Sequence, residues 1–340
     1  GWAGVDVFFV LSGFLVGGIL LDNRDANGAL VAFYARRAAR IIPLYVVWLG
    51  LFWMARTVGS WNDSTLLRDP LPAWSYLTYS QNVVTACTGN WGPRWISATW
   101  SLAVEEQFYI LLPPLVLILK PRHLGLACCG MAVAAPALRY ALTFRAGAWH
   151  ASYVLLPARC DSLFLGVLGA CLVRRPWFDR LLARRPAVTD VAALASAATV
   201  AGIVRGWYGR PGWWYFPSVV SVAALSLVLF AVYSPRRRWL EVGVLRWVGG
   251  ISYGVYMFHM AAQSAAYLLV GEPEPVLRSA SQLWIPAVAL AGTLAAAQLS
   301  FAYFESPLVR LGRRVKYRRE ATLHADGAAC PTPVSRATAR

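Results

Sequence analysis

The sequence has few charged residues and lacks the motifs of common soluble enzymes. Asp, Glu, Lys and Arg make up 14% of its 340 residues, against about 25% in a typical soluble domain. Hydrophobic residues, counted without glycine, make up 58%. No G-x-S-x-G motif, nucleotide-binding loop or HExxH motif occurs. These features exclude an ordinary cytosolic enzyme and a disordered chain.

The six cysteines form no recognisable metal site or redox motif. There is no CxxC pair and no cysteine next to a histidine at metal-ligand spacing. We therefore expect no metal and interpret the cysteines as small buried apolar residues. They are Cys87, Cys128, Cys129, Cys160, Cys171 and Cys330.

The chain is strongly basic, with a formal net charge of +16. Such a charge often indicates nucleic-acid binding. Here, however, the basic residues lie between long apolar runs, which is the pattern of a polytopic α-helical membrane protein. We therefore predict an all-α membrane helix bundle with lipid around it and no nucleic-acid partner.

Nine stretches are long and apolar enough to cross the hydrocarbon layer, which takes about 20 residues. A tenth stretch, 74–84, is too short, and we expect it to be re-entrant or to lie in the interface. The stretch 159–173 is also short and could extend back to Ala151. The nine predicted spans are 3–21, 41–58, 98–119, 125–143, 159–173, 188–205, 215–233, 248–270 and 283–304.

The connecting segments predict the orientation, because cytoplasmic loops carry an excess of Lys and Arg. If the connector 22–40 is cytoplasmic and the sides alternate, the cytoplasmic segments hold 23 Lys and Arg, and the outer segments hold 5. Cys87 and Cys330 then lie on opposite sides and should not pair. The sequence thus predicts a multi-pass protein of the cell (plasma or inner) membrane with a cytoplasmic C-terminus.

This orientation places Gly1 outside, although the sequence starts without a methionine or a signal peptide. We expect that an upstream helix is missing, which would give ten spans with both ends in the cytoplasm. At the other end we expect a membrane domain over 1–304, followed by a basic cytoplasmic tail over 305–340. This tail should be disordered after a short amphipathic start.

Ionisable side chains inside spans are costly and are therefore functional candidates. Asp6 lies near the outer end of the first span, a few residues before the small residues Ser12 and Gly13. The alternative is a helix-packing seam with one interfacial carboxylate.

Three arginines stand where the second span meets the cytoplasm. Arg37 and Arg40, three residues apart, share one helix face, and Arg36 adjoins them. Two guanidinium groups on one face suit bidentate binding of phosphates. The alternative is ordinary anchoring by positive charge.

The third span begins with two adjacent carboxylates, Glu105 and Glu106. They point about 100° apart on a helix, and placing both carboxylates against lipid would be costly. At least one of them should therefore face a protein interior or a wet cavity. There it could act as a base, an acid or the partner of a cation. The alternative is a carboxylate placed at the favourable end of the helix dipole.

Arg159 and Asp161 begin the span after the outer loop at 144–158. Residues two apart on a helix do not face each other, so we expect their partners on other helices. Arg139 lies deep in its own apolar stretch and needs an acceptor, for which Asp161, Glu105 and Glu106 are candidates.

His259 is the only histidine inside a predicted span, and it lies in the middle of it. Histidine transfers protons readily near neutral pH. A buried histidine can equally be a hydrogen-bonded structural residue, and we assign His259 mainly to structure or to the orientation of polar groups.

Six motifs in this order resemble the acyltransferase family 3 integral membrane proteins, the O-acetylase and O-acyltransferase superfamily. The resemblance covers almost the whole chain. The motifs are GVDVFFVLSGF (4–14), RRAARIIPLY (36–45), WSLAVEEQFY (100–109), PARCDSLFLG (157–166), ISYGVYMFH (251–259) and FESPLVRL (304–311).

The resemblance implies ten spans and the transfer of an acyl group, usually acetyl from acetyl-CoA, to a hydroxyl group. The acceptor would be a glycan, a glycolipid or a macrolide-like compound. Arg37 and Arg40 match the family's RxxR pair, thought to engage CoA, and Glu105 matches the WSL-x-x-E carboxylate. The donor acyl-CoA is a substrate, and no permanently bound cofactor is expected.

Two features depart from the family. Its proposed catalytic base is a histidine shortly before the first motif, and this sequence begins after that position. Ala261 stands where a proline often follows the YGVYMFH histidine. The alternatives to an acyltransferase are a glycolipid transporter or flippase and a catalytically dead paralogue.

These motifs give three groups of candidate site residues. The candidates for catalysis are Glu105, His259 and Asp6, those for donor binding are Arg37, Arg40 and Arg36, and those for a polar network near the substrate are Ser12, Trp100, Ser101, Glu106, Arg159 and Asp161.

Overall fold

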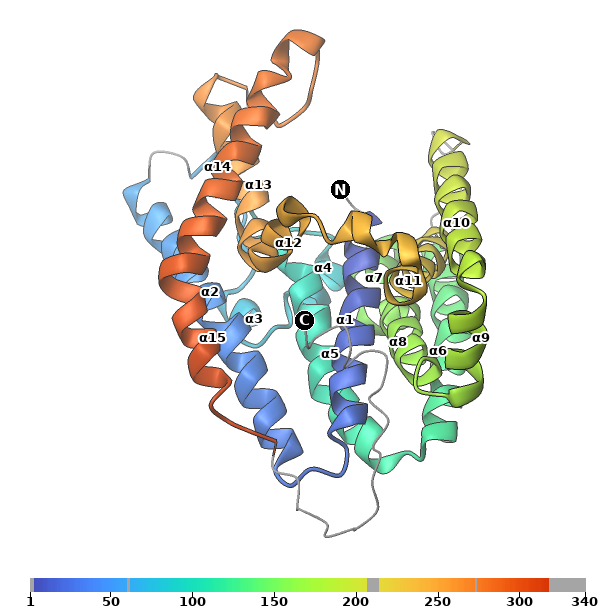
Figure 1. Ribbon diagram of the computed structural model, residues 1–340. Helices are drawn as coiled ribbons and strands as arrows, with labels where there is room; N and C mark the ends of the chain where they lie inside the picture. Colours follow the sequence, from blue (N-terminus) through green and yellow to red (C-terminus); the bar gives the residue numbers. More distant parts are fainter. Residues whose placement is uncertain (1–2, 60–61, 207–213, 273, 318–340) are drawn as a thin grey trace. The chain divides into compact units, whose positions relative to one another are not determined.

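The computed structural model describes residues 3–59, 62–206, 214–272 and 274–317, with only the backbone for 204–206 (Figure 1). Within these ranges the chain forms helices joined by short connections, and no β-strand occurs. They belong to two compact units, one with 3–27 and 104–242, the other with 28–103 and 243–317. The predicted tail from residue 318, including Cys330, lies outside the described residues.

Eight helical segments of the described chain are long and apolar enough to cross a membrane. This confirms the predicted all-α, polytopic fold class. The segments are Ala3–Asp22, Ala29–Val58, Thr99–Ile118, Pro121–Arg145, Trp149–Leu172, Pro186–Ile203, Phe216–Tyr233 and Ala280–Gly312.

The ninth predicted span, 248–270, differs from this set. Its residues form the end of α12 (Gly243–Gly250) and all of α13 (Ser252–Leu269). Helix α13 is not among the eight segments, because polar residues such as His259 and Gln263 interrupt its apolar sequence. The stretch 74–84 forms two short helices rather than one segment, α3 (Ala73–Leu77) and α4 (Gln81–Thr88).

Glycine and proline define several helix ends. Gly59, with φ of +78°, follows the last residue of α2 (Ala29–Val58), where the left-handed conformation favours glycine. Pro157 lies in the first turn of α8 (Leu156–Leu172), where its missing N–H is not needed. Helix α7 (Trp149–Val154) precedes α8, so the predicted extension to Ala151 is confirmed.

The first unit is organised around α1 (Ala3–Asp22) and α8, which pack with their backbones in contact. A β-carbon added to Gly13 would lie 2.0 Å from the carbonyl oxygen of Leu163, and one added to Gly166 would lie 2.2 Å from that of Val10. Small residues allow this close approach between membrane helices. The unit also contains α6 (Pro121–Tyr140), η1 (Ala141–Arg145), α9 (Pro176–Arg184), α10 (Pro186–Gly206), α11 (Phe216–Tyr233) and η2 (Pro235–Leu240).

The second unit joins α2 to the C-terminal helices. A β-carbon on Gly312, at the end of α15 (Ser306–Gly312), would lie 2.6 Å from that of Ala39 on α2, so these helices are in close contact. Helix α13 packs against α14 (Trp284–Ser300). The unit also contains η3 (Ala280–Gln282) and η4 (Phe301–Glu305), while α5 (Thr99–Ile118) passes from this unit into the first at residue 103.

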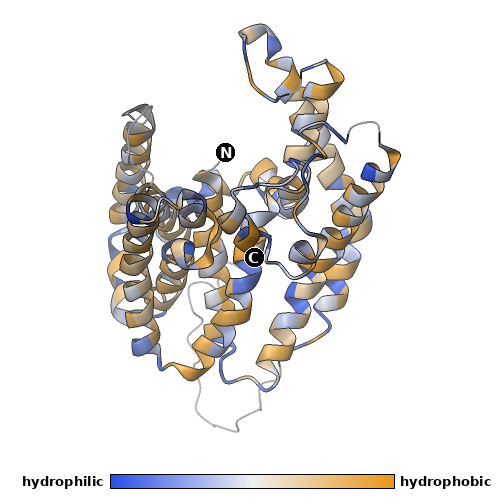
Figure 2. Cartoon of the chain, turned by 180° about the vertical axis from the view of Figure 1, so that it is seen from behind, coloured by the Kyte–Doolittle hydropathy of each residue, from blue (hydrophilic) through white to orange (hydrophobic). Residues whose placement is uncertain are grey.

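Apolar side chains remain exposed along the long helices. Val46 on α2, Leu194 on α10 and Leu290 on α14 are 52%, 72% and 57% exposed. Figure 2 shows hydrophobic residues along these helices and hydrophilic ones mainly in connections and at helix ends. Exposed apolar surface of this extent is expected where the solvent is lipid.

Candidate functional site

In the first unit, two motifs far apart in sequence meet at the carboxylate of Glu105. Ser12 on α1 donates a 2.7 Å hydrogen bond to Oε1 of Glu105 on α5. The hydroxyl of Tyr109 donates to the same oxygen and lies 2.7 Å from the hydroxyl of Ser12. Glu105 is only 3% exposed, so one of the two adjacent carboxylates does face the protein interior. We call Ser12, Glu105 and Tyr109 the carboxylate cluster.

Asp6 lies inside the protein and is paired with an arginine. Nη1 of Arg159 lies 2.9 Å from Oδ1 of Asp6, which also accepts a 3.1 Å hydrogen bond from Ser162. Arg159 donates to the backbone oxygen of Tyr153 at 2.7 Å, and its guanidinium lies 4.4 Å from that ring's centre. Asp6 is 1% exposed, so its carboxylate faces the protein interior.

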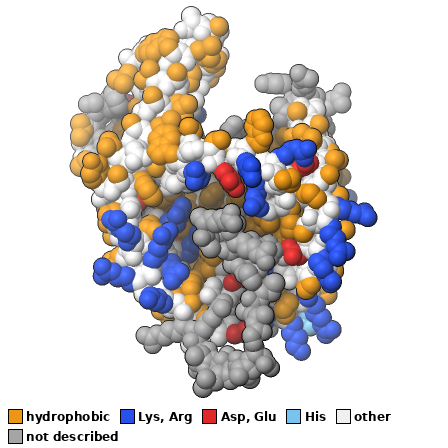
Figure 3. Space-filling model, in the orientation of Figure 1, with side chains coloured by type: hydrophobic (Ala, Val, Ile, Leu, Met, Phe, Trp, Pro, Cys, Tyr) orange, Lys and Arg blue, Asp and Glu red, His pale blue; other side chains and the backbone are white. Residues whose placement is uncertain are grey.

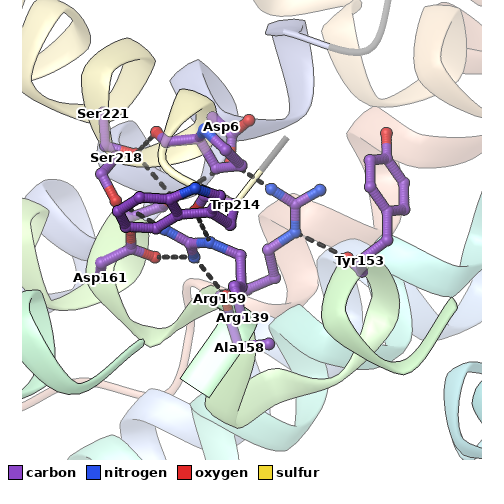
Figure 4. A network of polar contacts seen from close by, with 11 residues as sticks. Asp6, Arg139, Tyr153, Ala158, Arg159, Asp161, Trp214, Ser218 and Ser221 are labelled. Carbon is purple, nitrogen blue, oxygen red and sulfur yellow. Dashed lines mark hydrogen bonds and ion pairs between the residues drawn. The ribbon is translucent and has the colours of Figure 1, made fainter. Parts of the chain in front are cut away.

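A second buried ion pair joins α6 to α8. Nη1 and Nη2 of Arg139 donate to Oδ1 and Oδ2 of Asp161 at 2.9 and 2.6 Å, the fork geometry that suits guanidinium and carboxylate. Ser218 accepts a 2.6 Å hydrogen bond from Arg139, donates a 2.6 Å one to Asp161, and lies on α11. Figure 4 shows both ion pairs within one polar network.

These contacts confirm that Arg159 and Asp161 find their partners on other helices. They also show that, of the three candidate acceptors, Asp161 is the one that pairs with Arg139. Each carboxylate has a charged partner, because an unpaired charge in the low-dielectric interior would be very costly. The geometry of Asp6 and Asp161 therefore fits residues that position helices better than free proton acceptors.

In the second unit, the WSL motif contacts the YGVYMFH motif. The hydroxyls of Ser101 on α5 and Tyr256 on α13 lie 2.6 Å apart, and Tyr256 also donates to the backbone oxygen of Ala98. Trp100 is 8% exposed and meets Trp91 edge to face, with ring centres 6.4 Å apart.

His259 lies one turn after Tyr256 in the middle of α13, and its side chain is exposed. Its Nδ1 lies 2.6 Å from the backbone oxygen of Tyr256. Since a carbonyl oxygen only accepts, Nδ1 carries the hydrogen in this contact, and Nε2 of the neutral ring is then an acceptor.

The three arginines of the second motif differ in their contacts. Nε of Arg36 donates to the backbone oxygen of Val315 at 3.0 Å, and its guanidinium stacks 4.6 Å from the ring centre of Tyr317. The guanidinium of Arg37 lies 6.0 Å from the ring centre of Phe33. Arg36 thus connects α2 to the segment after α15, while Arg40 lies close enough to Glu305 for their charges to attract.

Helix α15 and the residues that follow it add further positive charges beside these arginines, and we call the whole set the basic cluster. Figure 3 shows Lys and Arg side chains gathered over α15 and the adjoining part of α2. The sequence analysis assigned the α15 residues only to the tail, because their nearness to α2 depends on helix packing. The basic cluster consists of Arg36, Arg37, Arg40, Arg310, Arg313, Arg314 and Lys316.

Several polar residues at these sites were not predicted. Tyr109 lies four residues after Glu105, a spacing that places both on one helix face and could have indicated it. Ser162 and Tyr256 lie within two of the quoted motifs but were not singled out, and Ser218 carried no signal beyond being a polar residue in an apolar run. Across the described ranges, no group of three or more His, Cys, Asp or Glu side chains is arranged to hold a metal ion.

Comparison with known families assigns the chain. A model of the family described as acyltransferase domain matches residues 3–302. The chain belongs to this acyltransferase family. Five of the six sequence motifs lie within the matched residues, and the last, at 304–311, follows them. The residues of the two polar sites and the α2 arginines therefore lie within the matched range.

Curated relatives agree with this assignment. The chain is 26% identical to the peptidoglycan O-acetyltransferase OatA of Listeria monocytogenes, over 92% of this chain and 52% of the relative. It is 24% identical to the O-acetyltransferase OatA of Staphylococcus aureus, over 92% of this chain and 53% of the relative. The chain thus spans about half the length of the curated relatives it matches. No solved structure matches it significantly.

Proposed function

We propose that this protein transfers an acyl group, most simply acetyl, from acyl-CoA to a hydroxyl group of a cell-envelope glycan. The observation that carries the proposal is the carboxylate cluster, a buried acid bonded to two hydroxyls inside an acyltransferase-family membrane domain. The acceptor class is taken from relatives named as O-acetyltransferases, one of them of peptidoglycan.

The donor would bind at the basic cluster. CoA carries several phosphate charges, and arginine forks bind phosphate oxygens in pairs. Arg37 and Arg40 lie three residues apart on α2, and the end of α15 supplies additional positive charge. Arg36 is held by Val315 and by Tyr317, so we assign it to shaping the site, with Arg37 and Arg40 as the main phosphate ligands.

The reaction joins a hydroxyl oxygen of the acceptor to the carbonyl carbon of the thioester. The carbon–sulfur bond breaks, CoA leaves as a thiolate that takes up a proton, and the proton of the hydroxyl passes to a base. The product is an ester on the glycan and free CoA. Neither an oxidant nor a metal ion is needed to balance this step.

We assign Glu105 as the carboxylate that receives the proton, through the hydroxyls that contact it. Ser12 and Tyr109 each hydrogen-bond to Oε1 of Glu105 and lie 2.7 Å from each other. A proton given to either hydroxyl can therefore move to the carboxylate along existing hydrogen bonds.

We assign His259 to orienting the hydroxyl of the acceptor. Its Nδ1 contact with the oxygen of Tyr256 fixes the ring and directs Nε2 as an acceptor. In the predicted orientation, the basic cluster is cytoplasmic and the loops 59–97 and 271–282 face outward. The donor would then approach from the cytoplasm and the glycan from outside.

Membranes containing the protein, incubated with acetyl-CoA labelled in its acetyl group, test the function. We expect label in the glycan fraction that mild alkali releases, as an oxygen ester requires. Membranes without the protein provide the control. Movement of a glycolipid across the membrane without labelling would contradict the proposal and identify a transporter. Binding of acetyl-CoA without transfer would identify an inactive member of the family.

A further inference from the structure

A polar pocket lies in the second unit, and none of its lining residues belongs to the carboxylate cluster or the basic cluster. Its volume is about 430 Å³, within the range of about 300–1,000 Å³ common for small-molecule sites. The segment between α2 and α5 forms most of it, and residues 274–276 before α14 complete its lining. The side chains that matter for its chemistry are Arg68, Asp69, Asn90, Trp91, Arg94 and Glu274.

Backbone hydrogen bonds hold the wall of the pocket in place. The N–H groups of Arg94 and Trp95 donate to the oxygens of Thr65 and Leu66 at 3.0 and 3.2 Å. The amide nitrogen of Asn90 donates to the backbone oxygen of Asp69 at 3.2 Å. These bonds connect the two ends of the loop, so the pocket is formed before any ligand arrives.

A turn positions Asn90 and Trp91 at the pocket. The side-chain oxygen of Asn90 accepts a 2.8 Å hydrogen bond from the N–H of Gly92. Gly92 has φ of +69°, and a β-carbon there would lie 2.8 Å from the hydroxyl of Tyr76, so glycine is required on both grounds. Trp91 also packs edge to face on Trp100.

The charges in the pocket are balanced. Arg68 and Arg94 provide several N–H donors, while Asp69 and Glu274 provide acceptors. A polyphosphate such as the CoA donor would be repelled by the two carboxylates, and a simple anion would need a net positive site. Neutral hydroxyl groups, which both donate and accept, match this combination, and the face of Trp91 suits the apolar face of a sugar ring.

The pocket adjoins the helix that carries His259. Nε of Arg94 donates a 3.1 Å hydrogen bond to Ser264 on α13, and the charge of Arg94 acts on His259 on the same helix. The loops that form the pocket belong to the predicted outer segments 59–97 and 271–282, which carry only three Lys or Arg residues between them. A glycan outside the cell could therefore reach the pocket directly.

We propose that this pocket binds a short saccharide segment of the glycan acceptor, with Trp91 stacking on a pyranose ring and Arg68, Arg94, Asp69 and Glu274 bonding its hydroxyls. The proposal rests on the proposed function for the class of acceptor. Arg94 would also align the bound sugar with α13, where Nε2 of His259 accepts a hydrogen bond from the reacting hydroxyl.

Saccharide binding can be measured on the purified protein in micelles without acetyl-CoA. Saturation-transfer NMR with soluble β-1,4-linked oligomers of N-acetylglucosamine and of glucose provides the readout. We expect at least one oligomer to bind, Trp91→Ala to weaken its binding about tenfold or more, and Trp91→Phe to retain most of the affinity. Trp74→Ala is the matched control, because Trp74 is an exposed tryptophan on α3 that does not line the pocket, and this variant should bind the oligomer normally.

A second measurement separates this proposal from the proposed function. In the acetyl-transfer assay, Trp91→Ala and Glu274→Gln should raise the KM for the oligomer and leave the KM for acetyl-CoA unchanged. Wild-type protein that binds an oligomer but transfers no acetyl group would support the pocket proposal and contradict the proposed acyltransferase function. Transfer that proceeds with unchanged oligomer KM in Trp91→Ala, or binding of neither oligomer to the wild type, would overturn the pocket proposal.

Discussion

The hydroxyl of Ser12 donates a 2.7 Å hydrogen bond to Glu105, a residue 93 positions later in the chain. The contact joins the first and third family motifs at one buried carboxylate. The position of Ser12 depends on how α1 packs against α8, because Val10 and Gly13, on either side of Ser12, contact α8 directly. Activity and helix packing are therefore expected to be linked in the first unit.

The contact between α1 and α8 should not tolerate even one additional methyl group. Gly166→Ala would place a β-carbon 2.2 Å from the backbone oxygen of Val10, so the helices must separate. We expect a loss of about 1–3 kcal/mol in the free energy of unfolding. Gly125→Ala on α6 is the control, because its β-carbon meets no atom within 4 Å. Equal thermal stability of the two variants in detergent would contradict the packing described.

The ion pair of Arg139 and Asp161 should be costly to break from one side. Asp161→Asn leaves a buried guanidinium without its counter-charge, and we expect a loss of about 3–5 kcal/mol. Arg139→Gln combined with Asp161→Asn should lose less than the two single losses added together, because no charge is then left unpaired.

A thermal-unfolding double-mutant cycle measures this coupling. Glu241→Gln, which removes the partner of Arg237 in an exposed pair with a 3.6 Å separation, is the control and should leave the stability unchanged. Simple additivity of the Arg139 and Asp161 variants would mean that the pair contributes no coupling.

Removing both phosphate-binding arginines should affect the donor and not the acceptor. Arg37→Ala with Arg40→Ala should raise the KM for acetyl-CoA strongly, since hydrogen bonds to charged groups contribute about 1.5–3 kcal/mol each. Arg40→Lys in place of Arg40→Ala should restore only part of the affinity for acetyl-CoA, because a point charge replaces the planar fork of arginine.

The matched control for the arginine variants is Arg238→Ala, which removes an exposed positive charge from another predicted cytoplasmic loop. It should leave both KM values unchanged. If the double variant binds acetyl-CoA as well as the wild type does, the pair serves only to anchor the helix at the membrane surface.

Loss of the His259 side chain should impair activity without abolishing it. An orienting hydrogen bond within a membrane protein contributes about 0.6 kcal/mol on average, whereas loss of a general base costs about 10²–10⁴ in rate. We expect His259→Ala to lower kcat by less than about a hundredfold. The acidic limb of its pH–rate profile should persist. A larger fall with disappearance of that limb would make His259 the base.

The sequence predicted the helices well because a span requires a long apolar run, and such runs are visible without structure. It also predicted that Arg139 and Arg159 need partners on other helices, because charge cannot stay unpaired in the membrane. It could not choose among Asp161, Glu105 and Glu106 for Arg139, since that choice depends on how α6 and α8 rotate against each other.

Sequence patterns were weaker where helices are polar or short. α13 carries His259, Gln263 and several tyrosines, so its apolar run is broken although it forms a helix of 18 residues. The turn that separates α3 from α4 includes Tyr79 at φ of +52°, which no pattern in the stretch 74–84 indicates. The pocket beside Trp91 was also missed, because its residues come from distant segments.

The rate of acetyl transfer by Glu105→Gln tests the central claim most directly. Glutamine retains the shape of the side chain and can bond to Ser12 and Tyr109, but it cannot take up the proton. We predict that the rate of esterification of the glycan falls by about 10²–10⁴ while the KM for acetyl-CoA stays unchanged. Glu241→Gln, the same change at an exposed site, should transfer acetyl at the wild-type rate. Transfer by Glu105→Gln within about tenfold of the wild-type rate would contradict the role of the carboxylate cluster.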